Sequence, residues 1–325
     1  MTKKVTIHDV VKASGYGLGT VSRVLSGKPG VKESTRQKIL KVIEELNYTP
    51  NVNGARLRQE HSGVIAVMVP VINHPFFARF VEEVESAATA KGYSILLVAS
   101  QMNVEKERAI LNKIKRKEVD GAIFVTHYEF ADDDIHGYPL VSVDRHLNHS
   151  VPFVSSDNYD ATKAAIEQFV KSGAKKIGYI GSKPFVDSEV LLREKAYLDV
   201  MKEHHLTPMI VNEVTEHGAE EALVDKFLEK YPDLDAIFAS GNTFSEVVYS
   251  KLMAQGKRMP EDIQLIGYDG VFYNWNDIPR ISSIQQPIKE MAVAAFNILV
   301  DLIENKKVKQ VNVYKTTFIK GKTTK

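Results

Sequence analysis

A glycine-rich stretch, GYGLGTVSRVL beginning at Gly15, is the first place where residue types and spacing suggest chemistry, because glycine loops can hold phosphate groups. The motif G-x-G-x-x-G requires a glycine where Ser22 stands, and it should follow a buried strand. The preceding segment has helical spacing instead, with Ile7, Val10 and Val11 on one face. We therefore interpret the stretch as the turn and second helix of a helix-turn-helix motif.

Polar residues also follow several apolar segments, where they would lie at the ends of strands. The segments PLVSV, VPFV, DAIFAS and IQLIG are followed by DRH, SSDN, GN and YDG. Apolar runs of this kind alternate with amphipathic segments from Gly63 onward, which predicts parallel sheets with helices on both faces. Such sheets bind ligands beyond the carboxyl ends of their strands. Two sheets with a cleft between them would bring these polar groups together.

Motifs of several common enzyme classes are absent from the sequence. There is no G-x-S-x-G, no H-E-x-x-H and no G-x-x-x-x-G-K. The chain has no cysteine, which excludes disulfides and thiolate chemistry. His204 and His205 adjoin on a predicted helix end, and adjacent helical residues do not share a face. We expect no catalysis, no cofactor and no metal site.

Charge is distributed unevenly along the 325 residues. Residues 1–62 hold 11 Lys and Arg against 5 Asp and Glu, a net charge of +6, whereas the whole chain carries +1. This basic region suits a polyanion, although a solvated basic surface would have the same composition. No apolar run approaches the roughly 18 residues of a membrane span, and the N-terminus lacks an apolar leader. We expect a cytoplasmic protein.

The basic region contains three segments with helical spacing. They cover about 6–13, 18–25 and 33–48, and Gly15 can form the turn between the first two because glycine tolerates a positive φ. Thr6 and Asp9 have the spacing of an N-cap and its partner. Pro50 ends the helical pattern, and a polar linker follows.

Five stretches together resemble a known family. TIHDVVKASGYGLGTVSRVLSG, TRQKILKVIEELNYTPN, GARL, LIGYDG and IQQPI are similar, in order and spacing, to the lactose/galactose repressor (LacI/GalR) family. The resemblance runs from Thr6 to about Gly321, and within the family it is strongest to the sucrose-operon repressors of Gram-positive bacteria. It implies an α/β protein with a helix-turn-helix head, a hinge helix and a periplasmic-binding-protein-like body, which forms a homodimer.

The resemblance also implies the domain organisation. A helix-turn-helix domain would occupy 1–49, a hinge helix or linker 50–62, and an effector-binding and dimerisation domain 63–325. The chain would cross three times between two doubly wound parallel-sheet subdomains of this body. The first subdomain would comprise about 63–155 plus 288–312, and the second about 156–287 plus 313–325.

DNA contacts are implied for the head and the hinge. In the family the second helix enters the major groove by its N-terminal end, where Leu18 and Gly19 match the specificity positions and Arg23 could bond a guanine bidentately. Leu57 matches a leucine that wedges into the minor groove. The alternatives are a packing helix with Arg23 in an ion pair, and a disordered linker with an incidental leucine. The full implied set is Thr6, Leu18, Gly19, Thr20, Ser22, Arg23, Asn51, Gly54, Arg56 and Leu57.

Three glycines depart from the family pattern in this region. Gly17 stands where serine usually caps the second helix, and glycine caps less well. Gly19 has no side chain with which to read a base. Gly54 stands where alanine is usual, and glycine lowers helix propensity by about 1 kcal/mol. We expect an altered operator preference and a hinge that orders less readily.

Ligand contacts are implied at the strand ends of the body. Carboxylate and guanidinium groups bond pairs of hydroxyls, and aromatic rings cover the apolar faces of sugars, so the set suits a sugar. Gly241-Asn242 stands where Asn-Asp is frequent, so Asn242 would substitute for a direct contact. The implied set is His74, Phe76, Phe77, Asp144, Ser156, Asp157, Arg193, Asn242, Asp269 and Gln286.

Each of these side chains also has a structural interpretation. An aspartate that ends a strand often caps the next helix or turn, as Asp144 and Asp269 could. Arg193 could form a surface ion pair, and His74 could be a turn residue. At least one of the two phenylalanines is expected in the core, because Phe80 and Val84 continue their stripe.

The expected function is that of a sequence-specific DNA-binding regulator, which represses a sugar-utilisation operon. Its partners would be pseudo-palindromic operator DNA, a sugar or sugar-phosphate effector of sucrose or fructoside type, and a second copy of the chain. A sugar-binding protein without a DNA role, and a ligand that acts as co-repressor, are the alternatives.

Leu57→Ala should weaken binding to the specific operator far more than binding to random DNA, because a wedge stabilises only the bent specific complex. Gel-shift titrations with both DNAs would measure the two affinities. An unchanged ratio between them would exclude the wedge.

Overall fold

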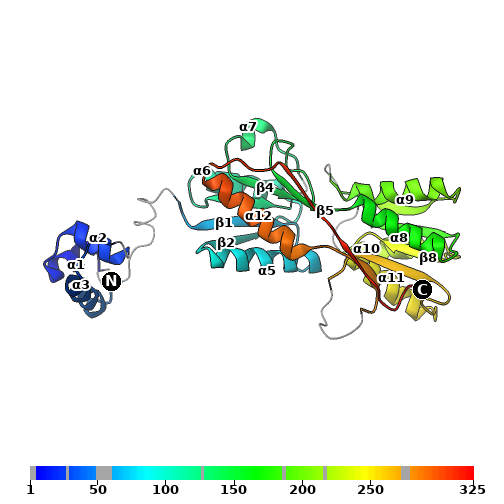
Figure 1. The fold of residues 1–325 in the computed structure, drawn as a ribbon, viewed down its shortest axis with the longest axis horizontal. Coiled ribbons are helices and arrows are strands. Elements are labelled where there is room, and N and C mark those ends of the chain that lie inside the picture. The colour runs from blue at the N-terminus through cyan, green and yellow to red at the C-terminus, as the bar shows by residue number, and fades with distance from the viewer. Residues whose placement is uncertain are drawn as a thin grey trace. The chain divides into compact units, whose positions relative to one another are not determined.

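The computed structural model divides the chain into two compact units, residues 1–62 and 63–325, here called the head and the body. Figure 1 shows the elements of each. The structure describes residues 5–26, 29–48, 61–125, 128–184, 188–214, 218–271 and 279–325.

The head contains the three predicted helices. They are α1 (Ile7–Ser14), α2 (Leu18–Leu25) and α3 (Glu33–Glu45). The third helix ends before the predicted residue 48 because Asn47 adopts φ 48°, a left-handed conformation that stops a helix. The Tyr48 N–H then returns to the carbonyl of Ile43 at 2.9 Å.

A small apolar core joins the head helices. Val10, Val21, Val24 and Ile39 are buried there, one or two from each helix. The Asp9 carboxylate accepts the backbone N–H of Thr6 at 2.8 Å, which satisfies a donor at the start of α1. Gly15 follows α1 with φ 72°, as the predicted turn requires.

The first sheet of the body has the strand order β11-β5-β4-β3-β1-β2 and is entirely parallel. Helices α5 (Pro75–Ala90) and α12 (Ile288–Ile303) contribute to the apolar core on one face, while α6 (Val104–Lys115) and α7 (Asp132–Ile135) contribute to the core on the other. Its strands are β1 (Val64–Val69), β2 (Ser94–Ala99), β3 (Gly121–Phe124), β4 (Leu140–Val143), β5 (Phe153–Ser156) and β11 (Val311–Tyr314).

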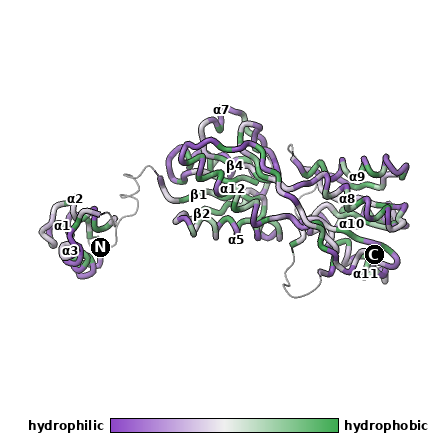
Figure 2. Tube along the Cα trace, viewed as in Figure 1, coloured by the Kyte–Doolittle hydropathy of each residue, from purple (hydrophilic) through white to green (hydrophobic). Residues whose placement is uncertain are grey.

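The second sheet has the order β12-β10-β9-β8-β6-β7, and only the edge strand β12 is antiparallel. Purple and green alternate along its helices in Figure 2, because one face of each packs on the sheet. The helices are α8 (Tyr159–Lys171), α9 (Leu191–Glu203), α10 (Glu220–Lys230) and α11 (Asn242–Ala254). The strands are β6 (Ile177–Ser182), β7 (Met209–Glu213), β8 (Ala236–Ala239), β9 (Gln264–Asp269), β10 (Ser282–Gln285) and β12 (Thr317–Ile319).

Three segments connect the sheets. They lie between β5 and α8, between β10 and α12, and between β11 and β12. The expected limits of the subdomains, at 155/156 and 312/313, fall inside strands, since Ser156 and Val313–Tyr314 still belong to the first sheet. The crossings begin only where the ladder hydrogen bonds end. Within the described ranges, no helix has the length and apolar character that a bilayer crossing requires.

Candidate functional site

The surface of α2 carries the residues that were expected to contact DNA. Leu18, Gly19 and Arg23 are exposed, whereas Val21 and Val24 of the same helix are buried in the head core. Thr20 and Ser22 are half-buried, and Thr6 is exposed at the start of α1. Arg23 forms no ion pair with any residue in the described part of the head, which does not favour the surface-pair interpretation.

Glycines shape the start of α2. Gly17 occupies the N-cap position, where no side chain bonds the first turn. A Cβ on Gly19 would meet nothing within 4 Å, so the head core does not require glycine there. The hinge residues Asn51, Gly54, Arg56 and Leu57 lie outside the described residues, and their roles stay predictions.

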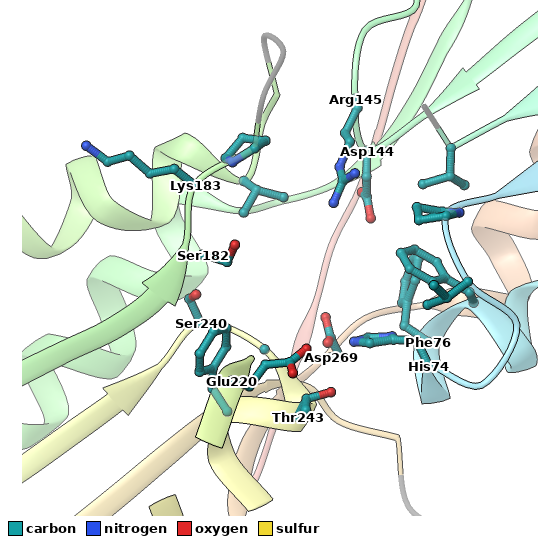
Figure 3. Close-up of a pocket in the computed structure, with 18 of the residues that line it drawn as sticks. His74, Phe76, Asp144, Arg145, Ser182, Lys183, Glu220, Ser240, Thr243 and Asp269 are labelled. Atoms are coloured by element: carbon teal, nitrogen blue, oxygen red, sulfur yellow. The ribbon is translucent and has the colours of Figure 1, made fainter. Parts of the chain in front are cut away.

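A cavity of about 530 Å³ opens where the carboxyl ends of the two body sheets meet (Figure 3). Both sheets contribute to its lining, as expected for a cleft between two parallel sheets. The polar residues of the lining are His74, Gln101, Asp144, Arg145, Ser182, Lys183, Arg193, Glu220, Ser240, Thr243 and Asp269. Pro70, Val71, Phe76, Phe77, Met102, Val125, Pro184, Val190, Gly241 and Phe244 complete it.

Arg193 on α9 is the most constrained charge in this cavity. Its side chain is only 3% exposed, and its Nε donates to Asn158 Oδ1 at 2.6 Å. Its Nη1 donates to the carbonyl of Ser240 at 2.6 Å, and the guanidinium carbon lies 3.5 Å from the ring centre of Tyr268. A buried cation needs such partners to offset the loss of water.

Asp269 ends β9 and connects the cavity to the crossovers. One carboxylate oxygen lies 4.0 Å from Arg193 Nη1 and accepts Gln286 Nε2 at 2.7 Å. Gln286 Oε1 accepts the Ser156 hydroxyl at 2.6 Å. The other oxygen of Asp269 accepts the backbone N–H of Asn242 at 3.0 Å, at the first turn of α11. The carboxylate therefore also stabilises the N-terminus of α11, which precedes β9 in the chain, whereas the structural interpretation placed the capping at the next helix or turn.

Asp144, which follows β4, lies on the opposite side of the cavity in Figure 3. It is 6% exposed and has φ 59°, and its Oδ1 accepts the Ser155 hydroxyl at 3.2 Å. Burial raises the pKa of Asp144 to about 6, a rise that Asp269 adds to and Arg193 opposes. Burial also lowers the pKa of the neighbouring Arg145 to about 10.

A segment of the second subdomain reaches across to Asp144. The Ser188 hydroxyl donates to the backbone carbonyl of Asp144 at 2.7 Å, and Ser188 forms an antiparallel bridge with Arg145. His146 Nε2 and Glu189 Oε1 lie 3.6 Å apart beside this bridge. These contacts join the two subdomains beside Asp144.

Aromatic side chains form one wall. The ring centres of His74 and Phe77 are 4.8 Å apart, and Phe76 packs edge-on against Phe77 at 5.6 Å. Phe76 is also buried against Phe80, with ring centres 6.2 Å apart, so it belongs to the core as well as to the lining. Phe77 is half-buried, which leaves part of its ring for a ligand.

Six of the ten expected ligand residues line the cavity: His74, Phe76, Phe77, Asp144, Arg193 and Asp269. Four do not. Ser156 and Gln286 are buried in the hydrogen-bond chain behind Asp269, and the Asp157 side chain accepts the N–H of Asp160 in the first turn of α8. Asn242 is buried at the start of α11 and bonds Asp269 through its backbone N–H.

Other polar residues that line the cavity were not among the ten expected ligand contacts. Arg145 and Ser240 stand at strand ends that the sequence pattern identified, in DRH and DAIFAS. Ser182 ends β6 and Lys183 follows it, and Gln101 lies just after β2. No sequence signal marked Glu220, which the fold brings in from the start of α10. No cluster of histidine and acidic side chains suited to a metal ion occurs among the described positions.

Comparisons with known proteins match both units. Residues 6–51 match the family model "Bacterial regulatory proteins, lacI family", and residues 166–324 match a periplasmic binding protein-like domain. The ribose operon repressor of Halalkalibacterium halodurans is 31% identical over 303 residues, covering 93% of this chain and 91% of that protein. The sucrose operon repressor of Lactococcus lactis is 28% identical and covers 93% of both, so identity does not single out the sucrose repressors.

Solved structures match the fold. The lac repressor dimer, bound to operator and an anti-inducer, superposes with a TM-score of 0.84 over 99% of both chains at 22% identity. The expected architecture of a helix-turn-helix head with a body of two parallel-sheet subdomains is therefore confirmed.

Asp144→Asn should change how stability depends on pH. Because the pKa of Asp144 in the folded chain, about 6, lies above its ordinary value of 3.8, the folded state binds the proton more tightly than the unfolded chain. The carboxylate therefore costs stability as pH rises from 4 to 6, by about 3 kcal/mol. Melting curves of wild type and Asp144→Asn should diverge over this window, with the variant more stable at pH 7.

Asp133→Asn controls for the loss of an aspartate, because Asp133 lies exposed on α7. A constant difference between Asp144→Asn and wild type from pH 4 to pH 7 would contradict the assignment.

Proposed function

Because the chain belongs to the lacI family of bacterial regulatory proteins, a family of DNA-binding transcription regulators, we propose that it represses a sugar-utilisation operon and leaves its operator when a sugar fills the body cavity. The observation that carries this proposal is the cavity of the body, which is lined by two buried carboxylates, a buried guanidinium and aromatic rings. The same chain also carries a helix-turn-helix head. The relatives named above are operon repressors, so we propose a regulator rather than an enzyme.

The exposed face of α2 supports a role as recognition helix. Leu18 and Gly19 lie in its first turn and Arg23 lies one turn further on, all exposed, while the opposite face anchors the helix to the head core. Leu18 offers apolar contact to a thymine methyl, and Arg23 can bond both acceptors of a guanine. Thr6, Thr20 and Ser22 would position the helix through phosphates, and Asn51, Gly54, Arg56 and Leu57 would supply the hinge contacts.

The first sheet supports homodimerisation. Its edge strand β2 carries the apolar side chains of Ile95, Leu96, Leu97 and Val98, and all four remain half-exposed. An apolar edge strand left open invites association with another chain. A second copy covering this edge would give a homodimer with two heads, one for each half of a palindrome.

Sugar would act through the equilibrium between an open and a closed body. Ligand that bonds both Asp144 and Arg193 is held by both subdomains, so it favours the closed form. Closure would move the first subdomains of the dimer against each other and change the spacing of the hinges. Effector and operator affinities must then change by the same factor.

Arg23→Ala should relax base preference at one position in each half-site, because it removes a bidentate contact worth about 1–3 kcal/mol of discrimination. Selection of preferred sites from a randomised DNA pool measures this change. Lys41→Ala removes an equal charge from an exposed position of α3 and should leave the preferred site unaltered. An unaltered preference in Arg23→Ala would remove Arg23 from base recognition.

Coupling between the two sites tests the function as a whole. Calorimetric titration of an inducing sugar should give a lower affinity when operator is bound, and operator affinity should fall equally when sugar is present. Higher sugar affinity on operator would identify a co-repressor instead. Equal affinities with and without operator would identify a sugar-binding protein without a regulatory DNA role.

A further inference from the structure

We propose that the effector is an uncharged sugar and that the cavity rejects the phosphate ester of the same sugar. This inference rests on the proposed function and narrows the chemical class of its ligand. A phosphate monoester carries a charge of about −1.5 to −2 at neutral pH, so it requires cations or N–H groups that are not already committed.

Three carboxylates line the cavity. Figure 3 shows Asp144, Asp269 and Glu220 around the same space, from opposite sides of it. Asp144 and Asp269 are 6% and 5% exposed, so water screens them poorly. Asp269 already raises the pKa of Asp144, which shows that the two charges repel each other across the cavity. A phosphate placed between them would bring its charge of about −1.5 to −2 to a region whose described lining offers no uncommitted cation to balance it.

The cations of the lining already interact with carboxylates of the protein. Arg193 donates to Asn158 and to the Ser240 carbonyl, and it lies 4.0 Å from Asp269. Lys183 points away from the cavity in Figure 3, with its Nζ 3.8 Å from Glu194 Oε2. Arg145 lies beside Asp144, whose charge favours the protonated guanidinium. Each cation of the lining is thus compensated by a carboxylate of the protein.

Helix N-termini often bind phosphate, but the helix N-termini at this cavity have N–H groups that are missing, already bonded or next to a carboxylate. Helix α5 begins with Pro75, which has no N–H to donate. The first N–H of α11, from Asn242, is bonded to the Asp269 carboxylate. Helix α10 carries Glu220 in its first turn, so its positive end already faces a carboxylate that lines the cavity.

The remaining lining groups suit hydroxyls. Ser182, Ser240 and Thr243 offer neutral donors and acceptors, and Gln101 adds an amide. The carboxylates of Asp144 and Asp269 accept hydroxyl protons, and the wall of Phe76 and Phe77 covers an apolar ring face. An uncharged polyol satisfies all of these groups, whereas a phosphate would leave the carboxylates opposed to it.

Matched pairs of probes test this inference on the full-length protein. We would measure thermal shifts and calorimetric affinities for ribose and ribose 5-phosphate, fructose and fructose 6-phosphate, glucose and glucose 6-phosphate, and sucrose and sucrose 6-phosphate. For each parent sugar that binds, the ester should bind at least about tenfold more weakly. Inorganic phosphate should produce no saturable shift beyond that of chloride at equal ionic strength.

A neighbouring pair of glutamates supplies matched variants. Glu220→Gln removes a carboxylate that lines the cavity and should reduce the discrimination between sugar and ester severalfold. Glu221→Gln removes the next carboxylate on α10, which does not line the cavity and pairs with Lys251, and should leave the discrimination unchanged. Equal discrimination in wild type and Glu220→Gln would contradict the electrostatic explanation.

Two further outcomes separate this inference from the proposed function. An ester that binds as tightly as its parent sugar, and weakens operator binding, would overturn the inference and leave the function intact. A protein that selects an operator but binds neither member of any pair would overturn the sugar part of the function and this inference together.

Discussion

The buried guanidinium of Arg193, and the groups that compensate its charge, determine how the strand ends of the body are arranged around the cavity. A guanidinium that is 3% exposed is tolerated only when several partners compensate it, and these partners come from distant parts of the chain. Asn158 lies in the first crossover, Ser240 follows β8, and Asp269 ends β9. The requirement to compensate one buried charge thus fixes the relative positions of a crossover and two strand ends.

The same hydrogen-bond network joins the cavity to the crossovers between the two subdomains of the body. Asp269 bonds Gln286, which precedes α12, and Gln286 bonds Ser156 at the end of β5. A ligand that changes the position of Asp269 therefore acts directly on two of the three segments that connect the sheets. The chain of groups between the cavity and these two segments is one carboxylate, one amide and one hydroxyl, all of them buried.

Contacts beside Asp144 also join the two subdomains. They are the hydrogen bond from the Ser188 hydroxyl to the Asp144 carbonyl and the partly buried pair of His146 and Glu189, whose Nε2 and Oε1 lie 3.6 Å apart. Noncovalent contacts of this kind can break and form again, as the proposed opening and closing of the body requires. Ligand groups that bridge Asp144 and Arg193 would supply the remaining free energy of closure.

The sequence by itself determined the order of elements, the head, and which strand ends carry polar residues, because hydrophobic periodicity and turn residues are local properties. Together with the family resemblance, it indicated Asp144, Arg193 and Asp269, which lie around the cavity, but also Ser156, Asp157, Asn242 and Gln286, which lie behind it or at helix starts. Only the tertiary structure decided this division, and only it brought in Glu220 from α10. Sequence spacing gives the face of one helix or strand, whereas the depth of a side chain in a cavity depends on how two sheets, far apart in the chain, pack together.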